Sequence, residues 1–191
     1  MQNPAVSSDT FHLHQPLRHQ SLMWQVAAGL IGVLVLTVAS RIDIPMVPVP
    51  MSMQTFAVLL IGAFYGWRLG TLTILAWLLC GALGLPVFAG GTGGMARFYG
   101  PTAGYLIAFP IAAACVGALV ARGWNRNRPA WAMLAMLLGH VICLGLGGLW
   151  LANTIGAQAA FAKGVNPFLL GAVAKSALVV VALLILVRRA R

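Results

Sequence analysis

The sequence predicts an all-α, polytopic membrane protein of about six transmembrane helices. Of its 191 residues, 61% are hydrophobic and only 7% are charged, whereas a soluble domain of this length needs far more charge on its surface. Several apolar runs approach or exceed the roughly 18–20 residues that cross a bilayer. We therefore expect a single transmembrane domain over residues 21–191, preceded by a polar tail over residues 1–20.

The first apolar run, Leu22–Ser40, is expected to be a helix. It is too long for a cleaved signal peptide, and the polar segment before it is too extended. That segment contains three histidines in "FHLHQPLRHQ", which allows a metal-binding arm. A solvated tail is favoured instead, because Pro4 and Pro16 discourage helix, and no metal site is predicted.

Proline and glycine divide the rest of the chain into further helices. Residues 45–50 contain three prolines, so this stretch stays extended and stiff. The next two helices are short for a full crossing, so they either extend into their flanks or include a re-entrant segment. The helices expected after the first are Met53–Tyr65, Thr71–Leu83, Thr102–Ala121, Ala130–Leu151 and Phe168–Val187.

The basic residues predict how the chain is oriented. With six spans the two termini share a side, which collects eight of the twelve basic residues, whereas the other side has three and the last span holds Lys175. Because cytoplasmic loops are enriched in Lys and Arg, both termini are expected to be cytoplasmic. The eight are Arg18, Arg68, Arg122, Arg126, Arg128, Arg188, Arg189 and Arg191, and the three are Arg41, Arg97 and Lys163.

The long, irregular connections are then all on the outer side, and they are unusually apolar. One of them, "GLPVFAGGTGGMARFYGPTAG" from Gly84 to Gly104, is rich in glycine. Outer loops can be slack connectors, but apolar loops need something to cover. We therefore expect a packed cap over a ligand pocket, with glycines 90, 91, 93 and 94 allowing close backbone approaches.

The acidic residues exclude several function classes. The chain has no glutamate, and its two aspartates, Asp9 and Asp43, lie outside the expected spans. Paired-carboxylate catalysis, carboxylate metal sites and the usual ion relays of secondary transporters are therefore disfavoured. No phosphate-binding loop is found either, because "GGTGG" lacks a following lysine and Ala174 replaces the glycine that such a loop needs. We expect neither an enzyme nor a bound cofactor.

Two cations have positions that suggest ligand contact. Lys175 lies eight residues into the last helix, about 12 Å below its start, and no acid within the membrane can pair with it. It could snorkel outward, but an anchor for an acceptor-rich or anionic ligand is favoured. Arg97 follows the glycine run, and its planar guanidinium suits a carboxylate, although a lipid headgroup is the alternative partner.

Four motifs together resemble the BioY family, the biotin-binding S components of energy-coupling-factor (ECF) vitamin transporters. They are "PVPMSMQTFAVLLIGAFYG", "LLCGALGLPVFAGGTGG", "GPTAGYLIAF" and "NPFLLGAVAKSAL", in that order over about residues 45–180. The resemblance implies an S-component fold of six helices in a bacterial plasma or inner membrane. It also implies an outward-facing biotin site under the outer loops and an energising module, which consists of a transmembrane T component and two ATPase subunits.

Two positions depart from the pattern that the family implies. The last-helix motif commonly has an acidic residue where this chain has Ala172, so any polar contact of that acid is in doubt. The small-residue motif of the first helix, which faces the T component in S components, is matched only by Ala28 and Gly32. Small residues four apart still permit close helix approach, so docking at these two positions is expected.

The resemblance and the residue chemistry together give a set of expected biotin contacts. Biotin offers a carboxylate, an apolar chain, a thioether ring and a ureido group, and its site needs cations, neutral hydrogen-bonding groups and apolar surface. A stand-alone transporter of another small carboxylated metabolite is the main alternative, a membrane enzyme or scaffold is a third, and no nucleic-acid partner is expected. The expected contacts are Arg97, Lys175, Tyr105, Thr102, Gln54, Asn153, Phe56, Phe88, Gly91 and Trp150.

Overall fold

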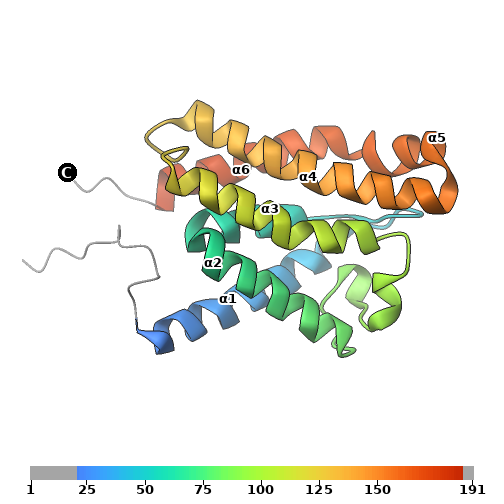
Figure 1. Cartoon of the computed structure of the whole chain (residues 1–191), viewed down its shortest axis with the longest axis horizontal. Coiled ribbons are helices and arrows are strands. Elements are labelled where there is room, and N and C mark those ends of the chain that lie inside the picture. Colours follow the sequence, from blue (N-terminus) through green and yellow to red (C-terminus); the bar gives the residue numbers. More distant parts are fainter. Residues whose placement is uncertain (1–20, 187–191) are drawn as a thin grey trace, which may run out of the picture.

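The computed structural model describes residues 21–186, which fold into a bundle of long helices lying side by side (Figure 1). The tail predicted over residues 1–20 lies outside the described residues, as do residues 187–191. In the described part, five helical runs are long and apolar enough to cross a membrane, which confirms a multi-pass membrane protein. They are α1 (Leu22–Arg41), α2 (Gln54–Ala82), α3 (Ala103–Ala121), α4 (Pro129–Ile155) and a run over Ala157–Leu186 that contains α5 (Ala157–Ala160), η4 (Phe161–Val165) and α6 (Phe168–Leu186).

The count is five where six helices were predicted, because α2 contains two of them. Gly66 has φ +74° and ψ 175°, a conformation that side-chain-bearing residues rarely adopt. The chain reverses there: a Cβ at Gly70 would lie 3.2 Å from the Cα of Gly62, whereas residues eight apart in a continuous helix are about 12 Å apart. α2 therefore has two arms, which match the two short helices expected from the sequence.

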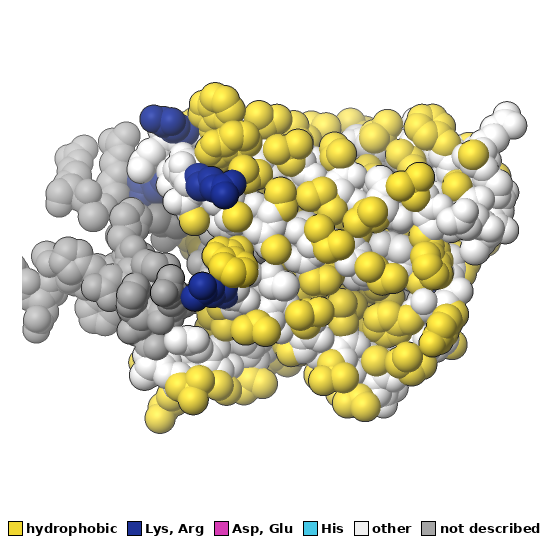
Figure 2. Space-filling view, viewed as in Figure 1, with side chains coloured by type: hydrophobic (Ala, Val, Ile, Leu, Met, Phe, Trp, Pro, Cys, Tyr) yellow, Lys and Arg dark blue, Asp and Glu magenta, His cyan; other side chains and the backbone are white. Residues whose placement is uncertain are grey.

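The two ends of the bundle differ in the way that the sequence predicts. The connections formed by residues 42–53, 83–102 and 156–167 all lie at the right-hand end in Figure 1, and the start of α1 and the end of α6 lie at the left-hand end. Figure 2 shows the visible Lys and Arg side chains gathered at that left-hand end. By the positive-inside rule it is the cytoplasmic end, and the irregular connections form the outer end.

The helices pack through small residues and expose large apolar ones. A Cβ at Gly62 in α2 would lie 2.7 Å from the carbonyl oxygen of Ala113 in α3, so the two backbones touch with no room for a side chain. Trp77 is completely buried in the core, whereas Leu34 and Leu149 are 64% and 67% exposed. Apolar side chains cover the face in Figure 2, as expected for a surface that meets lipid.

All three outer connections contain short regular elements that the sequence did not reveal. The proline-rich connection forms an antiparallel hairpin, in which β1 (Asp43–Ile44) pairs with β2 (Met51–Ser52). Extended conformation was predicted for residues 45–50, and this prediction is wrong there, because those residues form the bend that joins the two antiparallel strands. The strand pairing was not predicted. The glycine-rich connection contains two short 3-10 helices, η2 (Ala89–Gly91) and η3 (Met95–Phe98). The connection over residues 156–167, expected to be irregular, is mostly helical, because α5 and the π-helical turn η4 fill it.

The proposed docking surface on α1 needs a correction. Gly32 is buried against α2 of the same chain, where a Cβ would lie 3.1 Å from Cε2 of Tyr65 and would also overlap Thr73. Ala28 is half-buried on the same helix. The small residue at position 32 thus lets α1 approach α2 within this chain, and it is not free to meet a partner.

Candidate functional site

A pocket opens among the outer connections, and it brings together residues that are far apart in the sequence. It has about 640 Å³ of free volume, including its opening, which falls within the range of roughly 300–1,000 Å³ for small-molecule sites. Six of the ten predicted contacts line it. The lining consists of Val49, Pro50, Ser52, Gln54, Thr55, Phe88, Ala89, Thr92, Arg97, Thr102, Tyr105, Leu106, Phe109, Leu144, Phe168 and Lys175.

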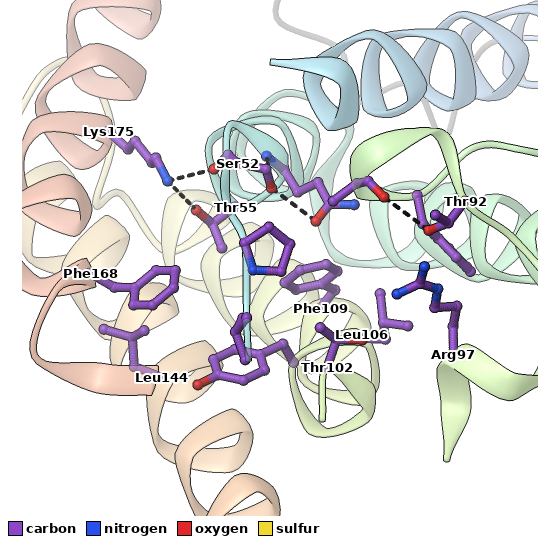
Figure 3. Close-up of a pocket in the computed structure, with 16 residues that line it drawn as sticks. Ser52, Thr55, Thr92, Arg97, Thr102, Leu106, Phe109, Leu144, Phe168 and Lys175 are labelled. Carbon is purple, nitrogen blue, oxygen red and sulfur yellow. Dashed lines mark hydrogen bonds between the residues drawn. The ribbon is translucent and has the colours of Figure 1, made fainter. Parts of the chain in front are cut away.

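Lys175 extends from α6 toward the start of α2. Its Nζ donates a hydrogen bond of 2.6 Å to the backbone oxygen of Ser52 and lies 3.4 Å from Oγ1 of Thr55 (Figure 3). Lys175 was expected to be a cation without a partner. It has no acidic partner in the described part of the chain, but that expectation is wrong in that two neutral oxygen atoms accept hydrogen bonds from its ammonium group. These acceptors carry no charge, so the positive charge of Lys175 remains available to a ligand.

Arg97 occupies the other end of the pocket. It comes from η3, in the glycine-rich connection, and its side chain is exposed. Figure 3 shows Arg97 and Lys175 on opposite sides of the lining residues, Lys175 being the more buried of the two. Within residues 21–186 the only acidic residue is Asp43, and it is not part of the lining. The pocket therefore has a cation at each end and no carboxylate.

The polar side of the pocket is a chain of hydrogen bonds around Gln54. The Ser52 hydroxyl donates to Oε1 of Gln54 at 3.0 Å, and Nε2 of Gln54 donates to Oγ of Ser40 at 3.0 Å. Elsewhere in the lining, Thr102, the residue before α3, is half-buried, and its side chain makes no capping bond to the helix. The pocket thus offers hydroxyl and amide groups as well as charge.

The apolar side is built on aromatic packing. Phe88 is buried and meets Trp77 edge-on, with ring centroids 5.0 Å apart. Trp77 also contacts Phe109, at 6.2 Å. Trp77 lies outside the lining, so it acts as a support that fixes Phe88 and Phe109 beneath the pocket.

The glycine-rich connection is a folded part of the pocket wall, as predicted. Gly90, Gly91 and Gly94 all have positive φ, which permits tight turns that other residues rarely adopt. The amide of Phe88 bonds to the Thr92 oxygen at 2.9 Å, and the amide of Gly94 reaches back to Gly81 in α2 at 2.7 Å. These bonds close the connection into a compact turn.

Four of the predicted contacts lie outside the lining. Asn153 is exposed near the end of α4, and Phe56 is half-buried against the core. Gly91 lies beside the guanidinium group of Arg41 and has φ +70°, a conformation that favours glycine. Trp150 donates a hydrogen bond of 3.0 Å from Nε1 to the oxygen of Gly100. Direct ligand contact by these four residues has no support from their positions.

Several lining residues were not predicted from the sequence. Ser52 and Thr55 come from the proline-rich connection and the first turn of α2, and the "PVPMSMQT" motif was the only signal for them. Tyr105 was predicted as a contact; its ring lines the pocket, while its hydroxyl donates to the oxygen of Gly164 at 2.6 Å. The apolar residues that were missed resemble ordinary helix residues in sequence: Leu106, Phe109, Leu144 and Phe168.

His140 takes no part in the pocket. It is buried in α4, where its Nδ1 lies 3.1 Å from the oxygen of Met136 and 3.0 Å from Oγ of Ser176 in α6. These contacts make His140 a hydrogen-bonded packing residue between α4 and α6.

The fold and the pocket together define a multi-pass membrane protein with a small-molecule pocket at one end of its bundle. The model of the BioY family matches residues 12–191. The chain belongs to the BioY family, which confirms the resemblance found in the four motifs.

Relatives and a solved structure agree with this assignment. The chain is 41% identical over 145 residues to the probable biotin transporter BioY of Pyrococcus horikoshii, covering 76% of this chain and 85% of the relative. It is 34% identical to the biotin transporter BioY2 of Lactococcus lactis subsp. cremoris, covering 83% and 87%. A crystal structure of the S component for biotin from an ECF-type ABC transporter has a TM-score of 0.78 at 24% identity, over 87% of this chain and 92% of that chain. The fold is therefore that of an S component.

Proposed function

We propose that this protein captures biotin from the outer face of the membrane and delivers it inward as the substrate-binding component of an ECF transporter. The observation that carries the proposal is the pair of cations, Arg97 and Lys175, at opposite ends of an otherwise neutral pocket. The names of the relatives, which describe biotin transporters, support the same substrate. Membership of a family of transport components also means that the chain is not an enzyme.

The arrangement of the pocket suits the two ends of biotin. The more exposed Arg97 is the better partner for the carboxylate, because its fork of donors matches two carboxylate oxygens. The ureido group then lies toward Lys175, where Gln54 and the hydroxyls of Ser52 and Thr55 offer further hydrogen bonds. Phe88 and Phe109 provide apolar surface for the chain between the two ends.

Active delivery requires a source of energy that this chain does not supply, since its sequence has no nucleotide-binding loop. We propose a T component and two ATPase subunits as partners, in a bacterial plasma or inner membrane. Because Gly32 is internal, the contact with the T component has to involve other positions. On α1 these include exposed side chains such as Leu30, Leu34 and Val38.

Ligand-dependent thermal stability of the purified protein tests the substrate. Biotin at one hundred times its Kd should stabilise the folded state by about 2.7 kcal/mol. Lipoate, which has a carboxylate, an apolar chain and a sulfur ring but no ureido group, should stabilise it far less. Equal stabilisation by both would favour another small carboxylated metabolite as the substrate. Biotin accumulation by cells that lack the ATPase subunits would favour a stand-alone transporter.

A further inference from the structure

The outer end of α1 reaches both walls of the pocket without lining it. Two adjacent residues, Ser40 and Arg41, make these contacts. Oγ of Ser40 lies 3.0 Å from Nε2 of Gln54, and Nη2 of Arg41 lies 2.6 Å from the backbone oxygen of Pro86. Neither Ser40 nor Arg41 belongs to the lining, and the proposed binding of biotin makes no use of them.

Ser40 determines how the amide of Gln54 is oriented. The Ser40 hydroxyl is completely buried and donates its one hydrogen to the oxygen of Leu36, at 2.7 Å. It can therefore only accept from its second neighbour, so Nε2 of Gln54 has to face it. Oε1 of Gln54 then faces the Ser52 hydroxyl, which donates to it at 3.0 Å. Ser52 is the residue whose backbone oxygen holds Lys175.

Arg41 fastens the turn that forms the opposite wall. Its guanidinium donates to the oxygen of Pro86 and lies against Gly91, at the two sides of the turn. Between them, the backbone of Phe88 bonds to Thr92 and Gly91, at 2.9 and 3.0 Å. Phe88 and Thr92 both line the pocket, so a group that holds Pro86 and Gly91 in place also holds this wall.

We propose that the outer end of α1 positions both walls of the ligand pocket, Ser40 through the amide of Gln54 and Arg41 through the turn of residues 86–92. Ser40 and Arg41 are thus positioning residues that touch no ligand. A displacement of α1 relative to α2 loosens both walls together. The choice of biotin as the ligand rests on the proposed function, whereas the positioning itself does not.

Binding measurements on four variants test this inference. Arg41→Ala and Ser40→Ala should each weaken biotin binding by roughly three- to tenfold, the range expected for one lost hydrogen bond. Two matched controls should change it by less than about twofold. Arg68→Ala removes an exposed arginine that lies over Trp67. Thr37→Ala removes a hydroxyl that bonds only within α1, to the oxygen of Val33 at 2.8 Å.

Two further readouts separate positioning from a general loss of stability. In hydrogen exchange without ligand, Arg41→Ala should speed exchange of the backbone amides of residues 88–94 and leave that of residue 54 unchanged. Ser40→Ala should speed exchange of the backbone amide of residue 54 and leave residues 88–94 unchanged. Arg41→Lys, which keeps a charged donor, should restore part of the affinity. Ser40→Ala should have no further effect on binding once Gln54→Ala is present, because it acts through that amide.

The outcomes distinguish this inference from the proposed function. If the wild type binds biotin and both α1 variants bind it equally well, the positioning role is wrong. It is also wrong if exchange rises evenly over the whole chain, because the two residues then only stabilise the fold. If the wild type does not bind biotin, the proposed function fails, and the exchange pattern still decides the positioning role.

Discussion

The two ends of the bundle use the same residue type, glycine, for opposite purposes. At mid-bundle and toward the cytoplasmic end, Gly62 and Gly117 bring α2 and α3 so close that no side chain fits between them. At the outer end, Gly90, Gly91 and Gly94 have positive φ and let the chain turn around a pocket. Close contact excludes a ligand, whereas the irregular turns make room for one.

The outer end also contains backbone carbonyl groups that need hydrogen-bond donors from outside their own segment, whereas carbonyl groups inside a long helix accept from amides of the same helix. Carbonyl oxygens in irregular segments near the membrane need donors, and here side chains of helices supply them. The proline-rich connection (residues 42–53) receives one such bond, the glycine-rich connection (residues 83–102) receives two, and the connection over residues 156–167 receives one. The donor and acceptor pairs are Lys175 to Ser52, Arg41 to Pro86, Trp150 to Gly100 and Tyr105 to Gly164. The pocket walls are thus fastened by donors from the helices.

The largest effect is expected where glycine permits backbone contact. Gly62→Leu should abolish the folded protein, because its Cβ would lie 2.7 Å from a backbone oxygen of α3, and overpacking of even a few methylenes costs about 1–3 kcal/mol or more. Gly145→Ala is the matched control, since a Cβ there meets nothing within 4 Å. Size-exclusion chromatography and thermal unfolding in detergent measure both. A monodisperse Gly62→Leu protein of normal stability would contradict the close contact.

The next largest effect is expected at Lys175, the half-buried cation. Lys175→Met keeps the length of the side chain and removes its charge, so it loses a charge-assisted bond to the ligand of roughly 1.5–3 kcal/mol. Biotin affinity should fall by about tenfold to over a hundredfold. Calorimetry on the purified variant measures this loss. Unchanged affinity would mean that Lys175 only fastens the oxygen of Ser52.

A smaller and more selective effect is expected at the exposed cation. Arg97→Ala should weaken biotin by about fivefold to fiftyfold but weaken a neutral biotin amide much less, because only the acid uses the guanidinium. Measuring both ligands on both proteins completes a thermodynamic cycle. Equal losses for acid and amide would show that Arg97 does not recognise the carboxylate.

The smallest effect is expected from a donor that serves a loop. Tyr105→Phe keeps the ring in the pocket and removes only the bond to Gly164. Stability should fall by about 1 kcal/mol, while biotin affinity should change by less than about threefold. Thermal unfolding and calorimetry on the same sample test this together. A loss of affinity as large as that of Lys175→Met would mean that the hydroxyl contacts the ligand.

The sequence predicted the features that depend on composition and local pattern. The long helices, the gathering of the connections at one end of the bundle and the turn-forming glycines follow from hydropathy, helix count and residue type, and these predictions are confirmed. The two short helices expected on either side of residues 66–70 are the two arms of α2, but the sequence did not show that the reversal between them takes place at Gly66 alone.

Contacts between distant residues could not be predicted in the same way. Nothing in the sequence indicates that Lys175 meets Ser52 across 123 positions, or that Gly32 faces Tyr65 and not a partner. Aromatic residues were equally ambiguous: Phe88 lines the pocket, whereas Phe56 packs on the core. Such distinctions depend on helix rotation, which an apolar sequence with little amphipathic pattern does not specify.

The most direct test of the proposed function is an experimental structure of the complex with biotin. We predict that biotin lies in the pocket between Arg97 and Lys175, with its carboxylate about 2.7–3.2 Å from the guanidinium of Arg97 and its ureido group toward Lys175. Biotin bound elsewhere would contradict the site, and biotin with its carboxylate against Lys175 would contradict the assigned roles of the two cations.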